Sequence, residues 1–398
     1  MNTYRLSEIC EINPKKEIPL DSDSLVSFLP MEAVSTDGKI DTSKTVSVSQ
    51  VKNYSVFKNN DIIFAKITPC MENGKGAIVS NLINGYGAGS TEFIVLRPNE
   101  MVLSKWIYYF LSQKSFRLYC QQNMTGSAGQ KRVPAKFLAN CEMRVPNIEE
   151  QKHLISKIEE LFSELDNGVE TLKKTKQQLA VYRQAVFNSV IDSYPGEKFV
   201  LSEIAKTIDG DRGKNYPKRE EFSNEGFCLF LTVQNVRPYG WRFDNNSFIT
   251  KGKDEILNNG KLQLNDIVLT TRGTLGNVAV YDATVPYENV RINSCMLIIR
   301  ANTEKVSPYY LASFLMSPLF KFQVEKLKSG TAQPQIPANI LKNTVISVPT
   351  LEEQKQIVSE LNSRFSVCDS IEQTVDAALQ QAEAMRQSIL KKAFEGEL

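Results

Sequence analysis

The stretch PNIEEQKHLISKIEELFSELD, residues 146–166, returns as PTLEEQKQIVSELNSRFSVCD at residues 349–369. The two copies are offset by 203 positions and align without a gap. Identical residues still match near the ends of both copies, where Arg183 and Gln184 correspond to Arg386 and Gln387. The chain therefore contains an internal duplication, and a longer segment of sequence precedes each copy.

Both copies are predicted to form long helices, because apolar residues recur every seven positions over at least four heptads. A helix of this length spans roughly 65 to 70 Å, which exceeds the diameter of a small domain, so it should bridge parts of the molecule. We expect the two helices to form a coiled coil, although two core helices of an ordinary bundle are the alternative. The expected seam contains Ile158, Leu165, Leu172, Leu179, Leu361, Val375 and Ile389.

The duplication predicts four parts. Residues 1–147 and 193–349 are expected to be two similar globular domains, and residues 148–192 and 350–398 the long helices that follow them. The first helix leads from the first domain to the second, so the second helix should run back. The pair is then antiparallel and related by a pseudo-two-fold axis, which would let two copies of one partner bind equivalently.

The two globular segments repeat each other more loosely. An Asn-Asp turn precedes a short apolar run at Asn60 and again at Asn265, and a second apolar run at residues 91–97 corresponds to residues 294–300. These runs read as buried strands. Each segment then offers one helix, over residues 104–120 and 307–327. Short strands with few helices predict the α+β class for both domains.

Composition places the chain among globular proteins, with 42% hydrophobic and 23% charged residues. No apolar stretch approaches the roughly 18 residues of a membrane span, and the first 20 residues lack the apolar run of a signal peptide, so we expect a cytoplasmic protein with no membrane contact. The seven cysteines are scattered without a C-x-x-C pair, which favours reduced thiols over a disulfide frame or a zinc site.

Catalytic signatures are missing from the sequence. It contains no phosphate-binding G-x-x-x-x-G-K-[ST], no dinucleotide fingerprint, no H-E-x-x-H and no nucleophile elbow. It also lacks an Asn-Pro-Pro-Tyr-like loop for a flipped base, and His153 is the only histidine. We therefore expect no catalytic residues, no metal and no cofactor, although a self-contained methyltransferase or nuclease is one rival class to test.

Positive charge is concentrated in the globular segments. Residues 1–147 carry 17 Lys and Arg against 13 Asp and Glu, and residues 193–349 carry 19 against 15, so each has a net charge of +4. The two helical regions are negative, at −2 and −4. Contacts to nucleic acid, which need positive side chains at phosphates, therefore belong to the globular segments.

Each globular segment contains two small-residue loops with polar side chains. GSAGQKRVP at residues 126–134 corresponds to GTAQPQIP at residues 330–337, and residues 66–75 correspond to residues 270–277. Glycine allows close approach of the backbone, Gln can pair with adenine, and Arg or Lys can donate to guanine. Ordinary surface turns are the alternative. The candidate DNA-contacting residues are Lys66, Ser127, Gln130, Lys131, Arg132, Thr271, Arg272, Asn277, Thr331, Gln333 and Gln335.

The order of these features resembles the DNA specificity subunit of a type I restriction-modification system. The resemblance covers the whole chain and rests on the P-x-[IL]-E-E-Q-K entries at Pro146 and Pro349, the N-D-I strands, the G-[ST]-A loops and the ending RQSILKKAFEG at residues 386–396. One departure lies in the first segment, which has Lys66-Ile67-Thr68-Pro69 where the second has Thr271-Arg272-Gly273-Thr274.

The resemblance implies a non-catalytic subunit in which each globular segment is a target recognition domain reading one half of a bipartite site in double-stranded DNA. It also implies two methyltransferase subunits on the helical regions, which methylate adenine with S-adenosylmethionine, and restriction subunits that act as an ATP-driven motor-nuclease. A coiled-coil scaffold with two protein-binding heads is the other rival class, and salt-dependent duplex binding would distinguish the two.

Overall fold

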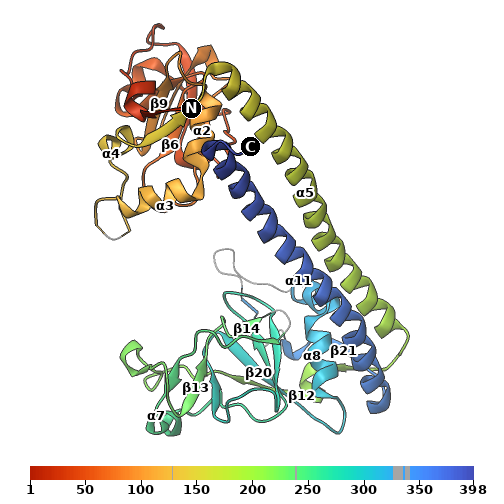
Figure 1. The fold of residues 1–398 in the computed structure, drawn as a ribbon. Coiled ribbons are helices and arrows are strands. Elements are labelled where there is room, and N and C mark those ends of the chain that lie inside the picture. The colour runs from red at the N-terminus through yellow and green to blue at the C-terminus, as the bar shows by residue number, and fades with distance from the viewer. Residues whose placement is uncertain (128, 238–239, 326–334, 337–340) are drawn as a thin grey trace. The chain divides into compact units, whose positions relative to one another are not determined.

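The computed structural model describes residues 1–127, 129–237, 240–325, 335–336 and 341–398. These residues form two compact units. Unit 1 comprises Met1–Lys173 and Asp376–Leu398, and unit 2 comprises Lys174–Val375. Each unit contains one globular segment and one end of each long helix, α5 (Ile148–Asp192) and α11 (Leu351–Glu395). Both chain termini lie in unit 1 (Figure 1).

The first sheet of unit 1 is built around the predicted Asn-Asp turn and strand. Its order is β2-β9-β6-β7, with all neighbours antiparallel, and its members are β2 (Cys10–Ile12), β9 (Phe93–Pro98), β6 (Ile62–Ala65) and β7 (Gly76–Ile78). Asn60 adopts the left-handed conformation at the turn, with φ of 73°. Both faces of β6 are covered by separate apolar clusters, which explains why its sequence is continuously apolar rather than alternating.

The second sheet of unit 1 has the order β4-β3-β8-β5, and its β3 and β8 run parallel. Its members are β4 (Thr45–Ser47), β3 (Leu25–Leu29), β8 (Tyr86–Gly89) and β5 (Ser55–Lys58). The unit also contains β1 (Asn2–Arg5) paired with β10 (Glu142–Val145), the helices α1 (Leu6–Ile9) and α4 (Ala135–Ala139), and the 3-10 turns η1 (Met31–Ala33), η2 (Val48–Asn53) and η3 (Ile83–Gly85).

Unit 2 repeats this construction. Its sheet β12-β20-β17-β18 contains β12 (Ala205–Asp209), β20 (Met296–Ala301), β17 (Asp266–Thr270) and β18 (Val278–Tyr281), and its sheet β16-β13-β19 contains β16 (Phe248–Ile249), β13 (Cys228–Leu231) and β19 (Val290–Ile292). The remaining elements are β11 (Glu197–Val200) paired with β21 (Val345–Val348), the ribbon β14 (Val236–Arg237) and β15 (Gly240–Trp241), and the helical turns α6 (Leu201–Ile204), η4 (Arg219–Glu221) and α7 (Lys251–Ile256).

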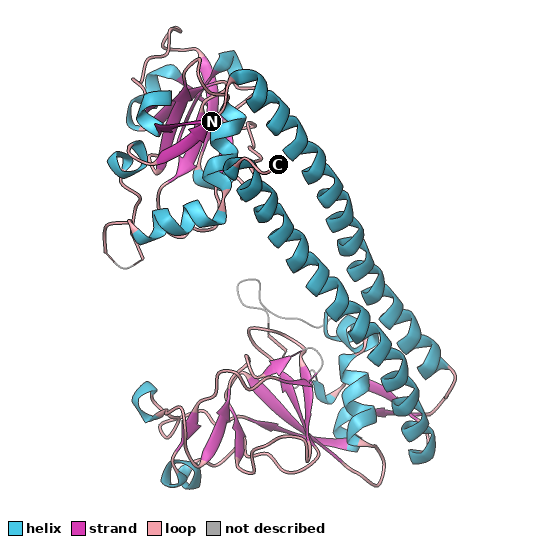
Figure 2. Ribbon diagram, viewed as in Figure 1, coloured by secondary structure: helices cyan, strands magenta, loops and turns pink. Residues whose placement is uncertain are grey.

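The two units also share individual side-chain contacts and turn conformations. In unit 1 the buried Asp61 pairs with Arg97 at 2.8 Å, and in unit 2 the buried Asp266 pairs with Arg300 at 2.7 Å. The turn residue Asn265 is left-handed like its counterpart, with φ of 71°. The prediction of two similar α+β segments and two long helices is confirmed, and Figure 2 shows the strands confined to the globular segments.

The single helix predicted after each main sheet is two helices. Unit 1 has α2 (Ser104–Ser112) and α3 (Lys114–Gln122), and unit 2 has α8 (Pro308–Met316) and α9 (Pro318–Glu325). In unit 2 the break falls at Ser317, because the proline that follows disfavours the helical conformation at the preceding residue. In unit 1 the equivalent Gln113 is extended, with ψ of 129°, and its carbonyl starts α3 by accepting from the Arg117 N–H.

The ends of the long helices pack antiparallel within each unit, through equivalent side-chain clamps. In unit 1, Arg386 of α11 forms an ion pair with Asp166 of α5 and lies 4.2 Å from the centroid of the Phe162 ring. In unit 2, Arg183 of α5 pairs with Asp369 of α11 at 2.6 Å and lies 5.5 Å from the centroid of the Phe365 ring. No helix among the described residues is both long and apolar enough to span a membrane.

Burial along the expected seam is uneven. Ile158, Leu361 and Val375 are buried, and the other four seam residues, Leu165, Leu172, Leu179 and Ile389, are half-buried. Leu165 and Ile389 still pack against the core of unit 1. Near the end of α11 the fully buried positions are Leu390 and Ala393, because they contact the globular core rather than only the opposite helix.

Candidate nucleic-acid interface

In unit 1 the two predicted loops lie side by side. The segment after β6 is joined to residues 125–133 by backbone hydrogen bonds, in which the Val133 N–H donates to the Lys66 carbonyl at 2.8 Å and the Thr68 N–H donates to the Lys131 carbonyl at 3.0 Å. An isolated bridge pairs Ile67 with Arg132. Loops that are about 60 residues apart in the sequence therefore form one edge of the unit.

Unit 2 makes the equivalent connection. The Ile336 N–H donates to the Thr271 carbonyl at 3.1 Å, as Val133 does to Lys66 in unit 1. The Arg272 Nε donates to the Gln335 Oε1 at 3.0 Å, so two residues predicted separately form one polar pair. The correspondence of Thr271 with Lys66 and of Gln335 with Arg132 follows from this shared pattern.

Three predicted residues of unit 1 present their side chains to solvent. Ser127, Gln130 and Lys131 are exposed, and their side chains make no hydrogen bond or ion pair with another described residue. A turn orders the backbone, because the Gln130 N–H donates to the Ser127 carbonyl at 3.0 Å. An ammonium, an amide and a hydroxyl are thus free to contact DNA without first breaking an internal bond.

Arg132 and Lys66 have internal partners instead. The Arg132 guanidinium donates to both carboxylate oxygens of Glu92, with the shortest contact at 2.8 Å, and to the Gln130 carbonyl. This hydrogen-bonded pair lowers the pKa of the Glu92 carboxyl and raises that of Arg132. The Lys66 Nζ donates to the Thr91 carbonyl at 2.7 Å. Both side chains fasten the loops to the turn before β9 in the free protein.

Two predicted residues of unit 2 are buried and support the loop. The Thr271 hydroxyl donates to the Cys295 carbonyl at 3.0 Å, and the Asn277 amide donates to the Val236 carbonyl at 2.9 Å. Arg272 is exposed and Gln335 is partly exposed. Thr331 and Gln333 lie outside the described residues. The structure therefore separates exposed candidates from structural ones, a distinction that the residue types did not make.

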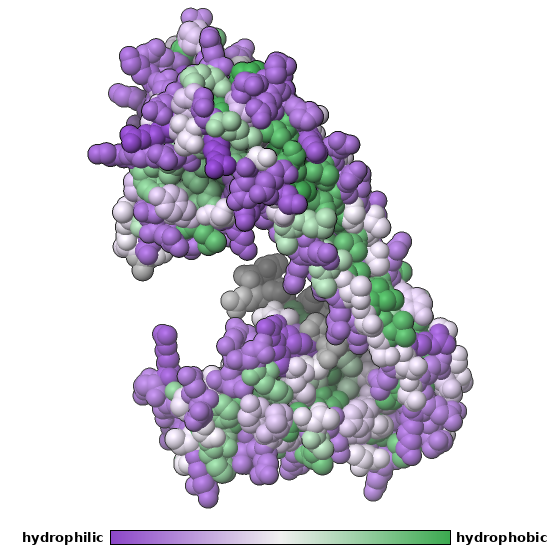
Figure 3. All heavy atoms as spheres, in the orientation of Figure 1, coloured by the Kyte–Doolittle hydropathy of each residue, from purple (hydrophilic) through white to green (hydrophobic). Residues whose placement is uncertain are grey.

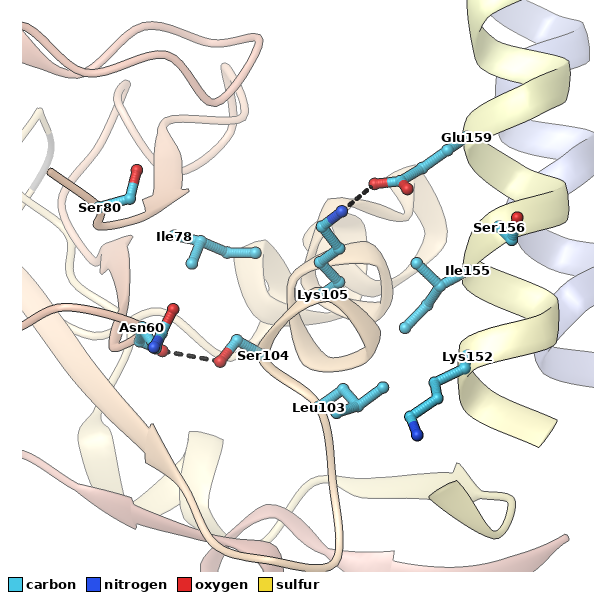
Figure 4. A pocket seen from close by; sticks show the side chains of 10 residues that line it. All are labelled: Asn60, Ile78, Ser80, Leu103, Ser104, Lys105, Lys152, Ile155, Ser156 and Glu159. Atoms are coloured by element: carbon cyan, nitrogen blue, oxygen red, sulfur yellow. Dashed lines mark hydrogen bonds and ion pairs between the residues drawn. The ribbon is translucent and has the colours of Figure 1, made fainter. Parts of the chain in front are cut away.

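Apart from these loops, unit 1 contains a groove of about 530 Å³ that the sequence did not indicate. It is lined by Asn60, Ile78, Ser80, Leu103, Ser104, Lys105, Lys152, Ile155, Ser156 and Glu159. Figure 4 shows Lys105 of α2 reaching Glu159 of α5, with which it forms a 2.5 Å ion pair. In unit 2 the equivalents of Lys105 and Ser80 are Tyr309 and Asp282, which hydrogen-bond to each other at 3.2 Å. The two units thus differ at the junction of helix and sheet.

The long helices also keep apolar side chains at the surface. Figure 3 shows apolar residues along their visible face. The large exposed ones are Val181 and Tyr182 on α5, and Leu351, Val367, Ile371 and Met385 on α11. Among the described residues no group of three or more His, Cys, Asp or Glu could hold a metal ion.

Both halves of the chain match one known family of sequences. The sequence profile described as "Type I restriction modification DNA specificity domain" matches residues 1–180 and again residues 196–381. The chain belongs to this family. The resemblance found in the sequence is thereby confirmed, and the two matches coincide with the two copies of the internal repeat.

Curated relatives from Escherichia coli agree with this assignment. The chain is 26% identical to the type I restriction enzyme EcoAI specificity subunit, over 94% of this chain and 79% of the relative. It is also 26% identical to the EcoKI specificity subunit, over 91% of this chain and 80% of the relative. A shorter match to the EcoEI specificity subunit reaches 36% identity but covers 48% of this chain and 33% of the relative.

Solved structures support the fold. One similar chain, from a study of complex assembly and conformational transition in a type I R-M system, has a TM-score of 0.75 and 18% identity, covering 100% of this chain and 98% of that chain. The HsdS subunit from Thermoanaerobacter tengcongensis has a TM-score of 0.51 and 18% identity, covering 100% and 97%.

Proposed function

We propose that this protein is a sequence-specific DNA-binding subunit that reads a bipartite duplex site and positions methyltransferase subunits on it. Residues 1–147 read one half of the site and residues 193–349 the other, while residues 148–192 and 350–398 form the spacer between them. The observation that carries this proposal is the repeated edge: in a chain of a DNA specificity family, the corresponding pair of loops is joined by an equivalent backbone hydrogen bond in both units.

At each edge, exposed candidate residues are proposed to contact DNA, and residues with internal partners are proposed to hold the loops in place. Ser127, Gln130, Lys131, Arg272 and Gln335 contact DNA, whereas Lys66, Arg132, Thr271 and Asn277 hold the loops in place. Arg272 and Gln335 act together, because the bond at Nε fixes the guanidinium and leaves its other N–H groups to face a base edge. Lys131 is a flexible point charge and contacts a phosphate. Thr331 and Gln333 remain candidates by sequence alone.

The proposed partners are supported by the relatives, which are named as specificity subunits of type I restriction enzymes. Two methyltransferase subunits bind the helical regions, whose exposed apolar residues support a protein interface there. Restriction subunits join this complex in the cytoplasm. The chain itself performs no chemistry, and the seam residues maintain the helical platform on which the catalytic subunits assemble.

The test uses the complete complex. The protein is assembled with its methyltransferase subunits and given a library of duplexes in which two short half-sites and the gap between them are randomised. Adenine methylation should select one bipartite sequence, with each half read independently. Selection of a single continuous site, or no selection at all, contradicts the proposal. The chain alone with labelled S-adenosylmethionine should transfer no methyl group, and transfer would show that it is an enzyme.

A further inference from the structure

Arg117 of α3 is buried in unit 1, with only 6% of the residue exposed. Its Nη1 donates to the Met71 carbonyl at 2.8 Å and, at 3.5 Å, to the Lys75 carbonyl. The guanidinium carbon lies 4.8 Å from the centroid of the Phe64 ring. The side chain therefore reaches from α3 to the end of β6 and to the far half of the loop that follows it.

A buried arginine is normally paired with a carboxylate, because an isolated charge is costly away from water. No described carboxylate forms an ion pair with Arg117, and its Nε has no hydrogen-bond partner. Burial lowers the pKa of the guanidinium to about 10, so the group is still charged at neutral pH. The charge is held instead by two backbone carbonyls and an aromatic ring, which is a poor arrangement for stability alone.

The carbonyls that hold this charge belong to residues 66–75, the predicted DNA-contacting loop of the first segment. Two other side chains anchor the same loop: the Lys75 Nζ donates to the Met31 carbonyl at 2.9 Å, and the Thr68 hydroxyl donates to Glu72 at 2.5 Å. Arg117 is the anchor that comes from the neighbouring helix α3. It also places a positive charge, without a carboxylate partner among the described residues, at the backbone of this loop.

Unit 2 has no such anchor at the equivalent position. Lys321 of α9 corresponds to Arg117, because each donates its N–H to the residue at the helix break, at 3.1 Å and 3.0 Å. Lys321 is exposed, and among the described residues its side chain makes no hydrogen bond or ion pair with the loop at residues 270–277. That loop is closed by its own Thr270, whose hydroxyl donates to the Thr274 carbonyl and accepts from the Asn277 N–H.

We infer that Arg117 is a positioning residue for recognition of the half-site read by residues 1–147, and that it sets the conformation of the loop at residues 66–75 without itself contacting a base. The inference rests on the proposed function. It adds that the two halves of the site are read through differently supported loops: one preorganised by a buried guanidinium from a neighbouring helix, the other by hydrogen bonds from uncharged hydroxyl and amide side chains.

The test compares Arg117→Met, Arg117→Lys and the matched control Lys321→Met in the complete methyltransferase complex, over the bipartite library. Arg117→Met should lower the preference at the first half-site about tenfold, the scale of one good base contact, and leave the second within about twofold. Arg117→Lys, which can still donate to the Met71 carbonyl, should recover part of that preference. Lys321→Met should leave both half-sites within about twofold of the parent protein.

The outcomes separate the inference from the function on which it rests. If the parent complex selects no bipartite site, the proposed function fails. If it does and Arg117→Met keeps full preference at the first half-site, or loses preference equally at both, Arg117 is a structural residue and the inference is wrong. Should Arg117→Met not fold, Arg117→Lys decides, because a first-half loss is still expected and an unchanged profile overturns the inference. Faster hydrogen exchange of the Lys75 amide in either variant would support loosening of the loop.

Discussion

The two loop edges share a backbone pattern but are held by different side chains. In unit 1 the anchors come from distant elements, namely Arg117 of α3 and the Glu92 carboxylate that binds Arg132. In unit 2 the loop is held by uncharged side chains, through Thr270 within the loop, Thr271 at the Cys295 carbonyl and Asn277 at the Val236 carbonyl. A duplicated frame can therefore keep its main-chain geometry while its side-chain supports change, which lets each copy acquire its own recognition surface.

The helix clamps show the opposite behaviour. Each is built from an arginine, an aspartate and a phenylalanine at corresponding positions of the two copies, and each copy supplies the arginine to one clamp and the other two residues to the second. The clamps differ in burial: 9% of the Arg183 side chain is exposed, against 29% for Arg386. Both copies of the duplicated helix therefore keep the same three residues in the same roles.

The largest expected effects concern the equivalent core positions Ile158 and Leu361, which are 0% and 1% exposed. Replacing either by Asp puts an unpaired charge into a core and should cost about 3 to 5 kcal/mol. Ile158→Asp should loosen unit 1 and Leu361→Asp unit 2, as measured by hydrogen exchange of each main sheet. Ser163→Asp, on an exposed position of α5, is the control. Equal loosening of both units by one substitution would show that they do not fold independently.

The next effect concerns base reading in unit 2. Arg272→Ala and Gln335→Ala should each reduce discrimination by about 1 to 3 kcal/mol, only at the half-site read by residues 193–349. Because the two side chains are bonded, the double variant should lose less than the sum of the single losses. The methylation profile over the bipartite library measures all three. Uniform weakening across every sequence would instead assign Arg272 to a phosphate.

A smaller effect is expected for Lys131 in unit 1. If its exposed ammonium contacts a phosphate, Lys131→Ala should weaken binding to all sequences alike and lower the slope of log affinity against log salt by about one unit. Binding titrations of the complex at several salt concentrations measure that slope. A change in sequence preference at the first half-site, with the slope unchanged, would mean that Lys131 reads a base.

The sequence predicted the repeated parts of this molecule well because repetition and periodicity can be seen in the chain without knowing which residues are in contact. The heptads gave the long helices, and the Asn-Asp turns marked the strands that begin the recognition edges. It also identified both loops of each edge. The sequence did not show which side chains are exposed. Thr271 and Asn277 are residue types that suit base reading, but both are buried in the structure.

The missed features all depend on partners that are far away in the sequence. Arg132 appeared available until Glu92, 40 positions earlier, was found to bind it, and nothing near Arg117 indicated that its side chain would hold residues 71–75. The helix break at Gln113 has no proline to signal it, unlike the break before Pro318. Such contacts are decided by tertiary packing, on which local propensity has little influence.

The smallest expected effect, and the sharpest contrast between the edges, is a pH dependence at the loop edge of unit 1 that is not expected at the loop edge of unit 2. The bond to Arg132 lowers the pKa of Glu92 in the folded protein, so this group stabilises the fold above the ordinary carboxyl pKa of about 4.3, and the contribution disappears as the pH falls through the lowered folded value. The difference in thermal stability between the parent protein and Glu92→Gln should therefore be constant near neutral pH and vanish in acid. It should be modest, because partly exposed ion pairs contribute little. At the equivalent place in unit 2 the partner of Arg272 is the uncharged Gln335, so the difference between the parent and Gln335→Ala should not change over the same range. A Glu92→Gln difference that persists in acid below the lowered folded pKa of Glu92 would mean that Glu92 supports the loop by packing rather than by charge, and the two edges would then differ less than their contacts indicate.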